Sequence, residues 1–262
     1  KMRSEQEIKM EISLLTSRSK MLTDVNHTGS WSYIRPSYRD KTAPCAAACP
    51  CGTDIPQVEM LAAQGRFRTA WETILMENPL PAVCGRVCFH PCETACNRGE
   101  FDSSIAVNNL ERFLADTAMK DEALDNIVKR SSNGKRIAVV GAGPAGLSAA
   151  CFLARLGYAC DVLEAEDEPG GVLRWGIPAY RLPSDILSWE IRRIKSAGVD
   201  IFCNTPVRGG FLREARGRYD AVFVGCGHGQ SQSLGIPGQH LAKDGLKFLS
   251  QVRKHTAAPR LG

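Results

Sequence analysis

Crowded cysteines constrain this chain more than any other feature. Of its eleven cysteines, most fall within one short stretch, as two strings: Cys45-x3-Cys49-Pro50-Cys51 and Cys84-x3-Cys88-x3-Cys92-x3-Cys96. No signal peptide precedes them, so thiolate ligation in a cytoplasmic protein is favoured over a secreted disulfide framework. Because the chain begins at Lys1 rather than Met, a fragment that lacks a targeting segment is an open alternative.

Iron–sulfur clusters suit these strings better than zinc does. The spacings would allow zinc pairs, but so many thiols exceed the needs of one zinc ion. A Cys-Pro step after a ligand is typical of four-iron ferredoxins. We expect Pro91 and Gly85 to break the second string, so that its thiols can converge. The four later cysteines fall in predicted helices and strands, where they are interpreted as small core residues: Cys151, Cys160, Cys203 and Cys226.

Glu111 is a candidate for an eighth ligand, because two cubane clusters need eight and the strings supply fewer. It lies in an otherwise apolar helical stripe made with Val107, Leu114 and Ala118. A buried carboxylate needs a compensating charge. That charge is either a salt bridge, to Arg112 or Arg98, or iron; the residues alone favour the salt bridge.

The periodicity divides the chain into four parts. Residues 1–40 are predicted to form a helix (4–22) and an irregular extension, and residues 41–122 an α-helical domain with helices over 57–76 and 104–120. A polar linker, 123–134, leads to an α/β domain, 135–262. There we expect strands over 136–140, 159–164, 199–203 and 221–224, with helices over 144–156 and 186–196. This alternation predicts a parallel sheet.

A dinucleotide-binding motif follows the first predicted strand: Gly141-Ala142-Gly143-Pro144-Ala145-Gly146. Its glycines allow a tight turn, a close approach of pyrophosphate and close packing of helix on strand, and the helix N-terminus attracts phosphate. Glu164, at the end of the next strand, is placed to meet an adenosine ribose. NAD and FAD both fit this geometry. Two further sets of glycines either allow the backbone to approach the ligand closely or merely form turns: Gly170 with Gly171, and Gly225, Gly227 and Gly229.

The distribution of charge and of apolar residues disfavours two roles, nucleic-acid binding and a membrane-spanning helix. The net charge of +5 is spread thinly, which is not a nucleic-acid-binding pattern. The apolar run 137–156 is long enough for a membrane span, but its glycines and Pro144 favour a strand, a turn and a helix.

Two motif sets together resemble one family. Cys45-x3-Cys49-Pro50, and then 85–96 with Gly85-Arg86-Val87-Cys88 and Pro91-Cys92-Glu93, resemble the N-terminal iron–sulfur domain of the glutamate synthase small-subunit family. That family includes dihydropyrimidine dehydrogenase and the large subunit of electron-bifurcating ferredoxin:NADP transhydrogenase. The segments 141–146, 164, 170–171, 176–183 and 219–223 resemble its flavin domain, so the match covers roughly residues 41–250.

The resemblance implies FAD at the glycine motif and two four-iron clusters, or one, in the helical domain. In the family one ligand is not always cysteine, and Glu111 stands at that position. The implied ligands are Cys45, Cys49, Cys51, Cys84, Cys88, Cys92, Cys96 and Glu111. The implied flavin-binding residues are Gly141, Gly143, Pro144, Ala145, Gly146, Glu164, Gly170, Gly171, Val172, Arg181, Gly225 and Gly227.

Three departures from the family pattern affect these expectations. An additional Cys-x2-Cys ahead of Cys45 is missing, so Cys51 and Cys84 replace it or one cluster is lost. Phe89 stands where proline commonly follows the cysteine. The chain stops at Gly262, about where the family's NAD(P)H domain begins, so either it is a fragment or a partner supplies the hydride chemistry.

The expected function is that of an electron-transfer subunit of an oxidoreductase. Electrons would pass between NAD(P)H-linked FAD and the clusters, to or from other subunits or a ferredoxin-like carrier. No general acid or base is assigned, and the cysteine spacing disfavours a disulfide reductase. Flavin-based electron bifurcation, and a structural adapter without cofactors, are the alternatives.

Overall fold

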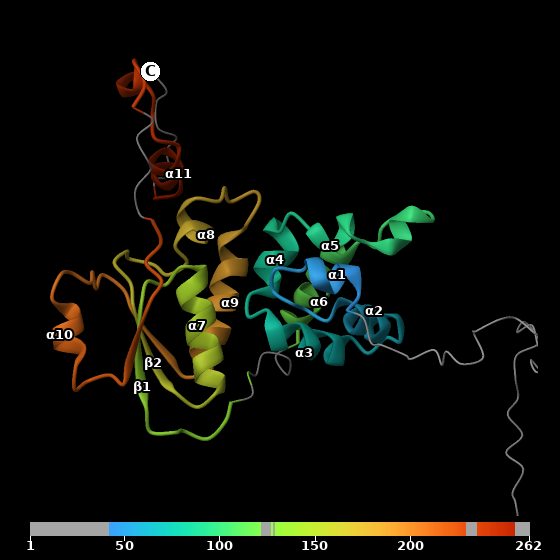
Figure 1. Ribbon diagram of the computed structural model, residues 1–262, viewed down its shortest axis with the longest axis horizontal. Coiled ribbons are helices and arrows are strands. Elements are labelled where there is room, and N and C mark those ends of the chain that lie inside the picture. The colour runs from blue at the N-terminus through green and yellow to red at the C-terminus, as the bar shows by residue number, and fades with distance from the viewer. Residues whose placement is uncertain (1–41, 122–126, 128, 229–234, 255–262) are drawn as a thin grey trace, which may run out of the picture. The chain divides into compact units, whose positions relative to one another are not determined.

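The computed structural model describes residues 42–121, 127, 129–228 and 235–254, all within one compact unit, residues 42–262 (Figure 1). The predicted helix over 4–22 and the extension to residue 40 lie outside the described residues, as do parts of the linker 123–134. In the described segments, no helix is both long and apolar enough to cross a membrane.

Residues 42–121 contain helices and, as predicted, no strand. The elements are α1 (Pro44–Ala48), α2 (Ile55–Ala63), α3 (Phe67–Glu77), α4 (Pro81–Val87), α5 (Pro91–Thr94), a 3₁₀ turn (Asn97–Glu100) and α6 (Val107–Ala118). Proline occupies the first turn of α1, α2, α4 and α5, where its missing N–H costs nothing. Asp54 caps α2 by accepting a hydrogen bond from the backbone N–H of Gln57 at 3.2 Å.

The single helix predicted over 57–76 is wrong: the chain forms α2 and α3 instead. The apolar spacing continues across both helices, which is why the periodicity missed the break. Gly65 has a φ of +73°, a left-handed conformation that ends α2 and that a side chain rarely adopts. The reversal lets α2 pack against α3, with Leu61, Trp71 and Ile74 buried between them and their neighbours.

Gly85 was predicted to break the second cysteine string, and this is also wrong. It lies inside α4, where a Cβ atom would come within 2.7 Å of the backbone N of Arg112 on α6. Its lack of a side chain therefore allows α4 and α6 to pack closely. The predicted break at Pro91 is confirmed, because α4 ends at Val87 and α5 begins at Pro91.

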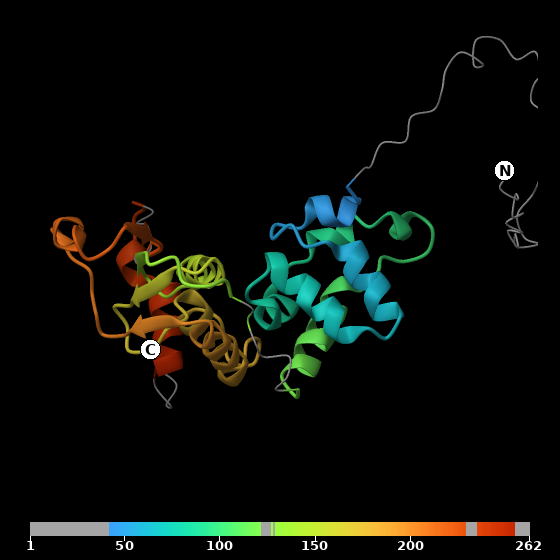
Figure 2. The same ribbon diagram turned by 90° about the horizontal axis from the view of Figure 1, so that it is seen from below.

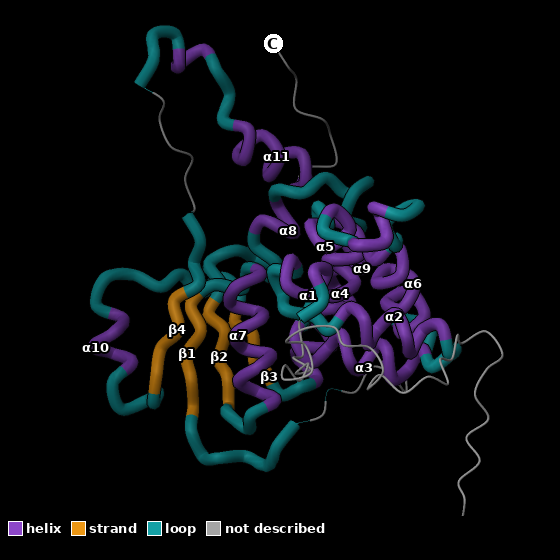
Figure 3. Tube along the Cα trace, turned by 45° about the vertical axis from the view of Figure 1, so that its right-hand side comes forward, coloured by secondary structure: helices purple, strands orange, loops and turns teal. Residues whose placement is uncertain are grey.

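The second half contains a parallel sheet in the order β3-β2-β1-β4 (Figure 3). The strands are β1 (Arg136–Val140), β2 (Ala159–Leu163), β3 (Val199–Phe202) and β4 (Ala221–Val224). The helices are α7 (Pro144–Arg155), α8 (Val172–Trp175), α9 (Ser184–Ser196), α10 (Phe211–Ala215) and α11 (Gly245–Lys254), with a 3₁₀ turn at Gln239–Leu241. The predicted strands and the helices α7 and α9 are confirmed to within two residues.

The strand order creates the crevice in which a ligand is expected. From β1 the chain moves to β2 and β3 on one side, and β4 then returns to the other side of β1. The carboxyl ends of β1 and β4 therefore flank a topological switch point, the usual binding place in such sheets. Helix α7 begins there, and it packs with α9 beside the sheet (Figure 2).

Helix α9 also contacts the helical half of the chain. Arg193 of α9 lies over the rings of Trp71 and Trp189, at 5.1 and 5.0 Å from their centroids. Arg155, at the end of α7, donates a hydrogen bond of 2.6 Å to the carbonyl of Leu75 in α3. The charged group of each arginine thus joins residues far apart in the sequence.

Candidate functional site

The two cysteine strings lie next to each other because α1 packs against α5. Helix α1 carries Cys45 and ends at Cys49, while α5 carries Cys92. Cys49 interacts electrostatically with Cys92 and shares a hydrogen bond with Cys51. The fold therefore brings thiols from both strings together, although more than thirty residues separate them in the sequence.

The thiols divide into two groups by their mutual interactions. In one group, Cys51 interacts with Cys49 and Cys84 and Cys92 interacts electrostatically with Cys49 and Cys88, so this group comprises Cys49, Cys51, Cys84, Cys88 and Cys92. The other is Cys45 with Cys96, beside the carboxylate of Glu59. The described residues thus provide one donor-rich group and one smaller one.

Crowding raises the pKa of several of these thiols. The hydrogen bond that Cys49 shares with Cys51, followed by burial, raises the pKa of Cys49 to about 12. Burial, and then the nearby Cys49, raises the pKa of Cys92 to about 11. Thiolates placed this close repel one another unless a cation lies among them, and iron would supply that charge.

No three Cys, His, Asp or Glu side chains form a ready site for a single metal ion in the described parts of the chain. A four-iron cubane has a different requirement, because each ligand binds a separate iron at a separate corner. The larger group offers the sulfur donors that this chemistry prefers, together with Glu111. The donor set therefore fits a cluster better than it fits one bare ion.

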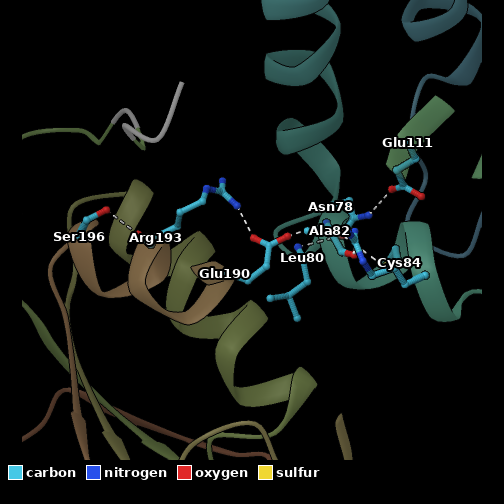
Figure 4. A network of polar contacts seen from close by, with 9 residues as sticks. Asn78, Leu80, Ala82, Cys84, Glu111, Glu190, Arg193 and Ser196 are labelled. Atoms are coloured by element: carbon cyan, nitrogen blue, oxygen red, sulfur yellow. Dashed lines mark hydrogen bonds and ion pairs between the residues drawn. The ribbon is translucent and has the colours of Figure 1, made fainter. Parts of the chain in front are cut away.

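Glu111 faces these thiols from α6, and the predicted salt bridge is wrong. Its Oε1 accepts a hydrogen bond from Nδ2 of Asn78 at 2.8 Å (Figure 4). The arginines considered as its partners bind elsewhere: Arg98 pairs with Asp102, and Arg112 with Asp116. Burial raises the pKa of Glu111 to about 8; the Asn78 amide lowers it, and Cys49 and Glu190 raise it. This carboxylate has a neutral donor where a cation was expected.

The core interpretation of the later cysteines holds for two of the four. Cys151 and Cys160 are buried between α7 and β2, whereas Cys203 is only half-buried. Cys226 is exposed in the loop after β4, so its prediction as a core residue is wrong. Cys226 lies two residues beyond β4, and the residues of β4 are themselves mostly exposed, so the end of this strand does not place a side chain in the core.

The glycine motif has the geometry that its spacing predicts. Gly141 has a φ of +97°, and a Cβ atom there would lie 2.6 Å from the carbonyl O of Gly225. At Gly146 a Cβ atom would lie 1.8 Å from the carbonyl O of Gly141, so helix and strand touch. At Gly143, by contrast, the nearest atom is 4.0 Å away, and the space beside the start of α7 stays open.

Other predicted residues surround this opening. Gly171 lies against Gly143, where a Cβ atom would come within 2.8 Å of the Gly143 Cα, and it begins α8 next to the exposed Val172. Gly225 follows β4 beside the motif, while Gly227 is exposed in the same loop. Pro144 and Ala145 form the first turn of α7. Arg181 is exposed in the turn before α9, and Gly229 is outside the described residues.

Glu164 is buried just after β2, with its carboxylate directed at backbone. Oε2 accepts from the N–H of Ala142 at 2.6 Å, and Oε1 from the N–H of Glu166 at 3.0 Å. These bonds fix the motif loop, and each oxygen keeps a second lone pair that a ribose hydroxyl could use. A cavity of about 500 Å³ opens elsewhere, lined in part by Arg136, Asp161 and Tyr219, and includes none of the predicted site residues.

Sequence reasoning missed the polar residues that join these parts. Asn78 and Glu190 are both buried, and both bind at the start of α4. An isolated Asn after a helix and a Glu on an amphipathic helix carry no signal in the sequence, because most such residues are solvated.

Comparison with known proteins agrees with this organisation. Residues 38–123 match the family described as dihydropyrimidine dehydrogenase domain II, 4Fe-4S cluster, and residues 139–176 match the NAD(P)-binding Rossmann-like domain. A solved structure of Mycobacterium tuberculosis FprA in complex with NADPH is 30% identical over 42% of this chain and 26% of that chain. Its TM-score is 0.35.

Curated relatives are named as oxidoreductase subunits. NADPH-Fe(3+) oxidoreductase subunit beta of Geobacter sulfurreducens is 38% identical over 80% of this chain and 33% of its own length. NADP(+)-dependent formate dehydrogenase subunit beta of Moorella thermoacetica is 39% identical over 80% of this chain and 34% of its own length. NAD-dependent dihydropyrimidine dehydrogenase subunit PreT of Salmonella typhimurium is 38% identical over 83% of this chain and 54% of its own length.

The chain thus spans a third to a half of the length of these relatives. Their names agree with the oxidoreductase function expected from the sequence. The resemblance is confirmed: this chain carries a segment that matches the four-iron domain of dihydropyrimidine dehydrogenase, then a segment that matches a Rossmann-like dinucleotide-binding domain, and its relatives are named as oxidoreductase subunits.

Proposed function

We propose that this chain is the electron-transfer part of a multi-subunit oxidoreductase, with FAD at the glycine motif and at least one four-iron cluster among the cysteines. The observation that carries this proposal is the packing of α1 against α5. This packing brings thiols of both strings together, and the same chain carries an open dinucleotide-binding loop. Bound FAD would exchange electron pairs with a nicotinamide and single electrons with a cluster.

The open space at Gly143 supports a dinucleotide at the switch point between β1 and β4. The N-terminus of α7 offers N–H groups and a positive dipole end to a pyrophosphate. FAD rather than NAD(P) follows from the resemblance, since the segment 176–183 accompanies the motif in the flavin members of the family. Gly171 and Gly225 would bring backbone close to the bound cofactor.

The larger thiol group supports one cluster, with ligands drawn from Cys49, Cys51, Cys84, Cys88, Cys92 and Glu111. Cys45 and Cys96 would serve a second site, where Glu59 is the other donor nearby. All eleven cysteines are free, which suits a reducing compartment such as the cytoplasm. The source of NAD(P)H electrons would be a further domain or a partner, and the acceptor another subunit or a ferredoxin-like carrier.

An electron-transfer experiment tests this function on the anaerobically purified chain. Bound flavin is reduced by light with a sacrificial donor, and the sample is then followed in the dark by visible absorption and low-temperature EPR. We expect flavin to reoxidise as a reduced-cluster signal grows. Cys92→Ser, which removes a proposed ligand, should leave the flavin reduced, whereas Cys151→Ser should behave as the parent chain does. Reduced flavin that persists beside an intact, oxidised cluster in the parent chain would overturn the relay.

A further inference from the structure

Asn78 lies where three parts of the candidate cluster site meet. It ends α3, it is 3% exposed, and its backbone N–H donates to the carbonyl of Ile74 at 2.9 Å. Its side-chain Oδ1 accepts from the N–H of Leu80 at 3.0 Å and from the thiol of Cys84 at 3.7 Å. Its Nδ2 donates to Glu111 (Figure 4). One amide therefore binds the start of α4, a cysteine and the carboxylate.

The two ends of this amide are not interchangeable. The N–H of Leu80 needs an acceptor, so Oδ1 must face α4, and Nδ2 then points to Glu111. A donor held in this way favours the anionic form of Glu111. It also fixes Oε1, which leaves the second carboxylate oxygen for another partner.

We propose that Asn78 is a positioning residue for Glu111 as a cluster ligand. The inference rests on the proposed function, because it requires that Glu111 bind iron. Because the amide holds Oε1 of Glu111, the second carboxylate oxygen, Oε2, is the one left to bind the cluster. By withdrawing electron density from the carboxylate it raises the reduction potential of the cluster.

A purely structural role for Asn78 predicts a different outcome. In that case the bond to Leu80 is what matters, since it satisfies a buried N–H at the start of α4. Asn78→Asp separates the two roles. Aspartate keeps an acceptor for Leu80 and nearly the same shape, but it replaces the donor to Glu111 with a second carboxylate oxygen.

The test compares Asn78→Asp with Asn109→Asp in the anaerobically purified chain. Asn109 is exposed on α6, two residues from Glu111. Asn109→Asp therefore adds the same charge without removing a hydrogen bond to the carboxylate. Both variants should keep the parent's circular dichroism. We expect Asn78→Asp alone to lose iron to a chelator about ten times faster or more, as removal of such outer partners does. Its remaining cluster should show an altered EPR spectrum and a more negative midpoint potential.

Equal chelation rates, spectra and potentials in both variants would overturn the role of Asn78. A parent chain that binds no iron would instead refute the proposed function itself, and an iron-loaded chain whose EPR spectrum is unchanged by Glu111→Ala would show that Glu111 is not a ligand. If Asn78→Asp fails to fold, Asn78→Ser takes its place. Its hydroxyl can accept from Leu80 but is too short to reach Glu111, so the same outcomes decide.

Discussion

Glu190 on α9 accepts a hydrogen bond of 2.6 Å from the backbone N–H of Ala82 in the first turn of α4. Its other oxygen forms an ion pair with Arg193, and neither charged side chain is more than 1% exposed. A carboxylate of the α/β half thus satisfies an N–H at the start of the helix that carries Cys84 (Figure 4). The helical half and the α/β half of the chain thus meet through a buried polar contact.

Glu190→Gln should destabilise the chain by about 3 kcal/mol, because it removes one charge of a buried ion pair. Urea unfolding, followed by the fluorescence of Trp71 and Trp189 beside Arg193, would measure it. Glu72→Gln is the control, since Glu72 pairs with Arg68 on the surface, where such a pair contributes at most about 0.5 kcal/mol. Equal stability of the two variants would contradict the importance of the Glu190 contact.

Substitution of two motif glycines should separate folding from cofactor binding. Gly146→Ala places a Cβ atom 1.8 Å from the carbonyl of Gly141, and overpacking of this kind costs about 1–3 kcal/mol. Gly143→Ala meets nothing closer than 4.0 Å, so it should fold normally but lose flavin, because its methyl group fills the space left for pyrophosphate. Thermal unfolding measures the stability of each variant, and flavin absorbance per chain measures how much cofactor each variant binds. Full flavin occupancy in Gly143→Ala would contradict the assigned site.

Gly85→Ala should displace α6 from α4 and weaken cluster binding. The added Cβ atom would lie 2.7 Å from the backbone N of Arg112, next to Glu111. The expected loss of stability is about 1–3 kcal/mol. Iron per chain and urea unfolding measure the two effects, with Gly209→Ala as the control because nothing lies within 4 Å of its Cβ position. Iron retention equal to that of the control would show that the close packing does not support the cluster.

Alkylation should distinguish the core cysteines from the exposed one. Burial raises the pKa of Cys151 and of Cys160 to about 11, so near pH 8 both stay protonated and shielded. In the folded chain, iodoacetamide followed by peptide mass spectrometry should modify Cys226, which is exposed, and spare both core thiols. Labelling of Cys151 should rise only as the pH approaches 11 or the chain unfolds. Rapid labelling of Cys151 at pH 8 would contradict its burial.

The sequence predicted the parts of the fold that follow from local periodicity. β1 and β4 have the expected bounds, because a short apolar run between turn residues has few alternatives. The break at Gly65 was missed because the apolar spacing on either side continued in register. Gly85 was misjudged because its role depends on α6, which approaches from more than twenty residues away.

The sequence predicted the candidate ligands and the dinucleotide-binding loop, but not the residues that hydrogen-bond to those ligands. The cysteine strings and the glycine motif have recognisable spacings, which the matched families share. The partner of Glu111 was not recognisable. A buried carboxylate suggested an arginine, but the fold provides the amide of Asn78, a contact across 33 positions that no local pattern records.

A count of iron, acid-labile sulfide, zinc and flavin in the anaerobically purified chain is the decisive test of whether the chain carries both FAD and a four-iron cluster. We expect about one FAD and at least about four irons, with an equal amount of sulfide, per chain. About eight irons would mean that Cys45 and Cys96 also hold a cluster. Zinc in place of iron, without bound flavin, would contradict an electron-transfer role for this chain.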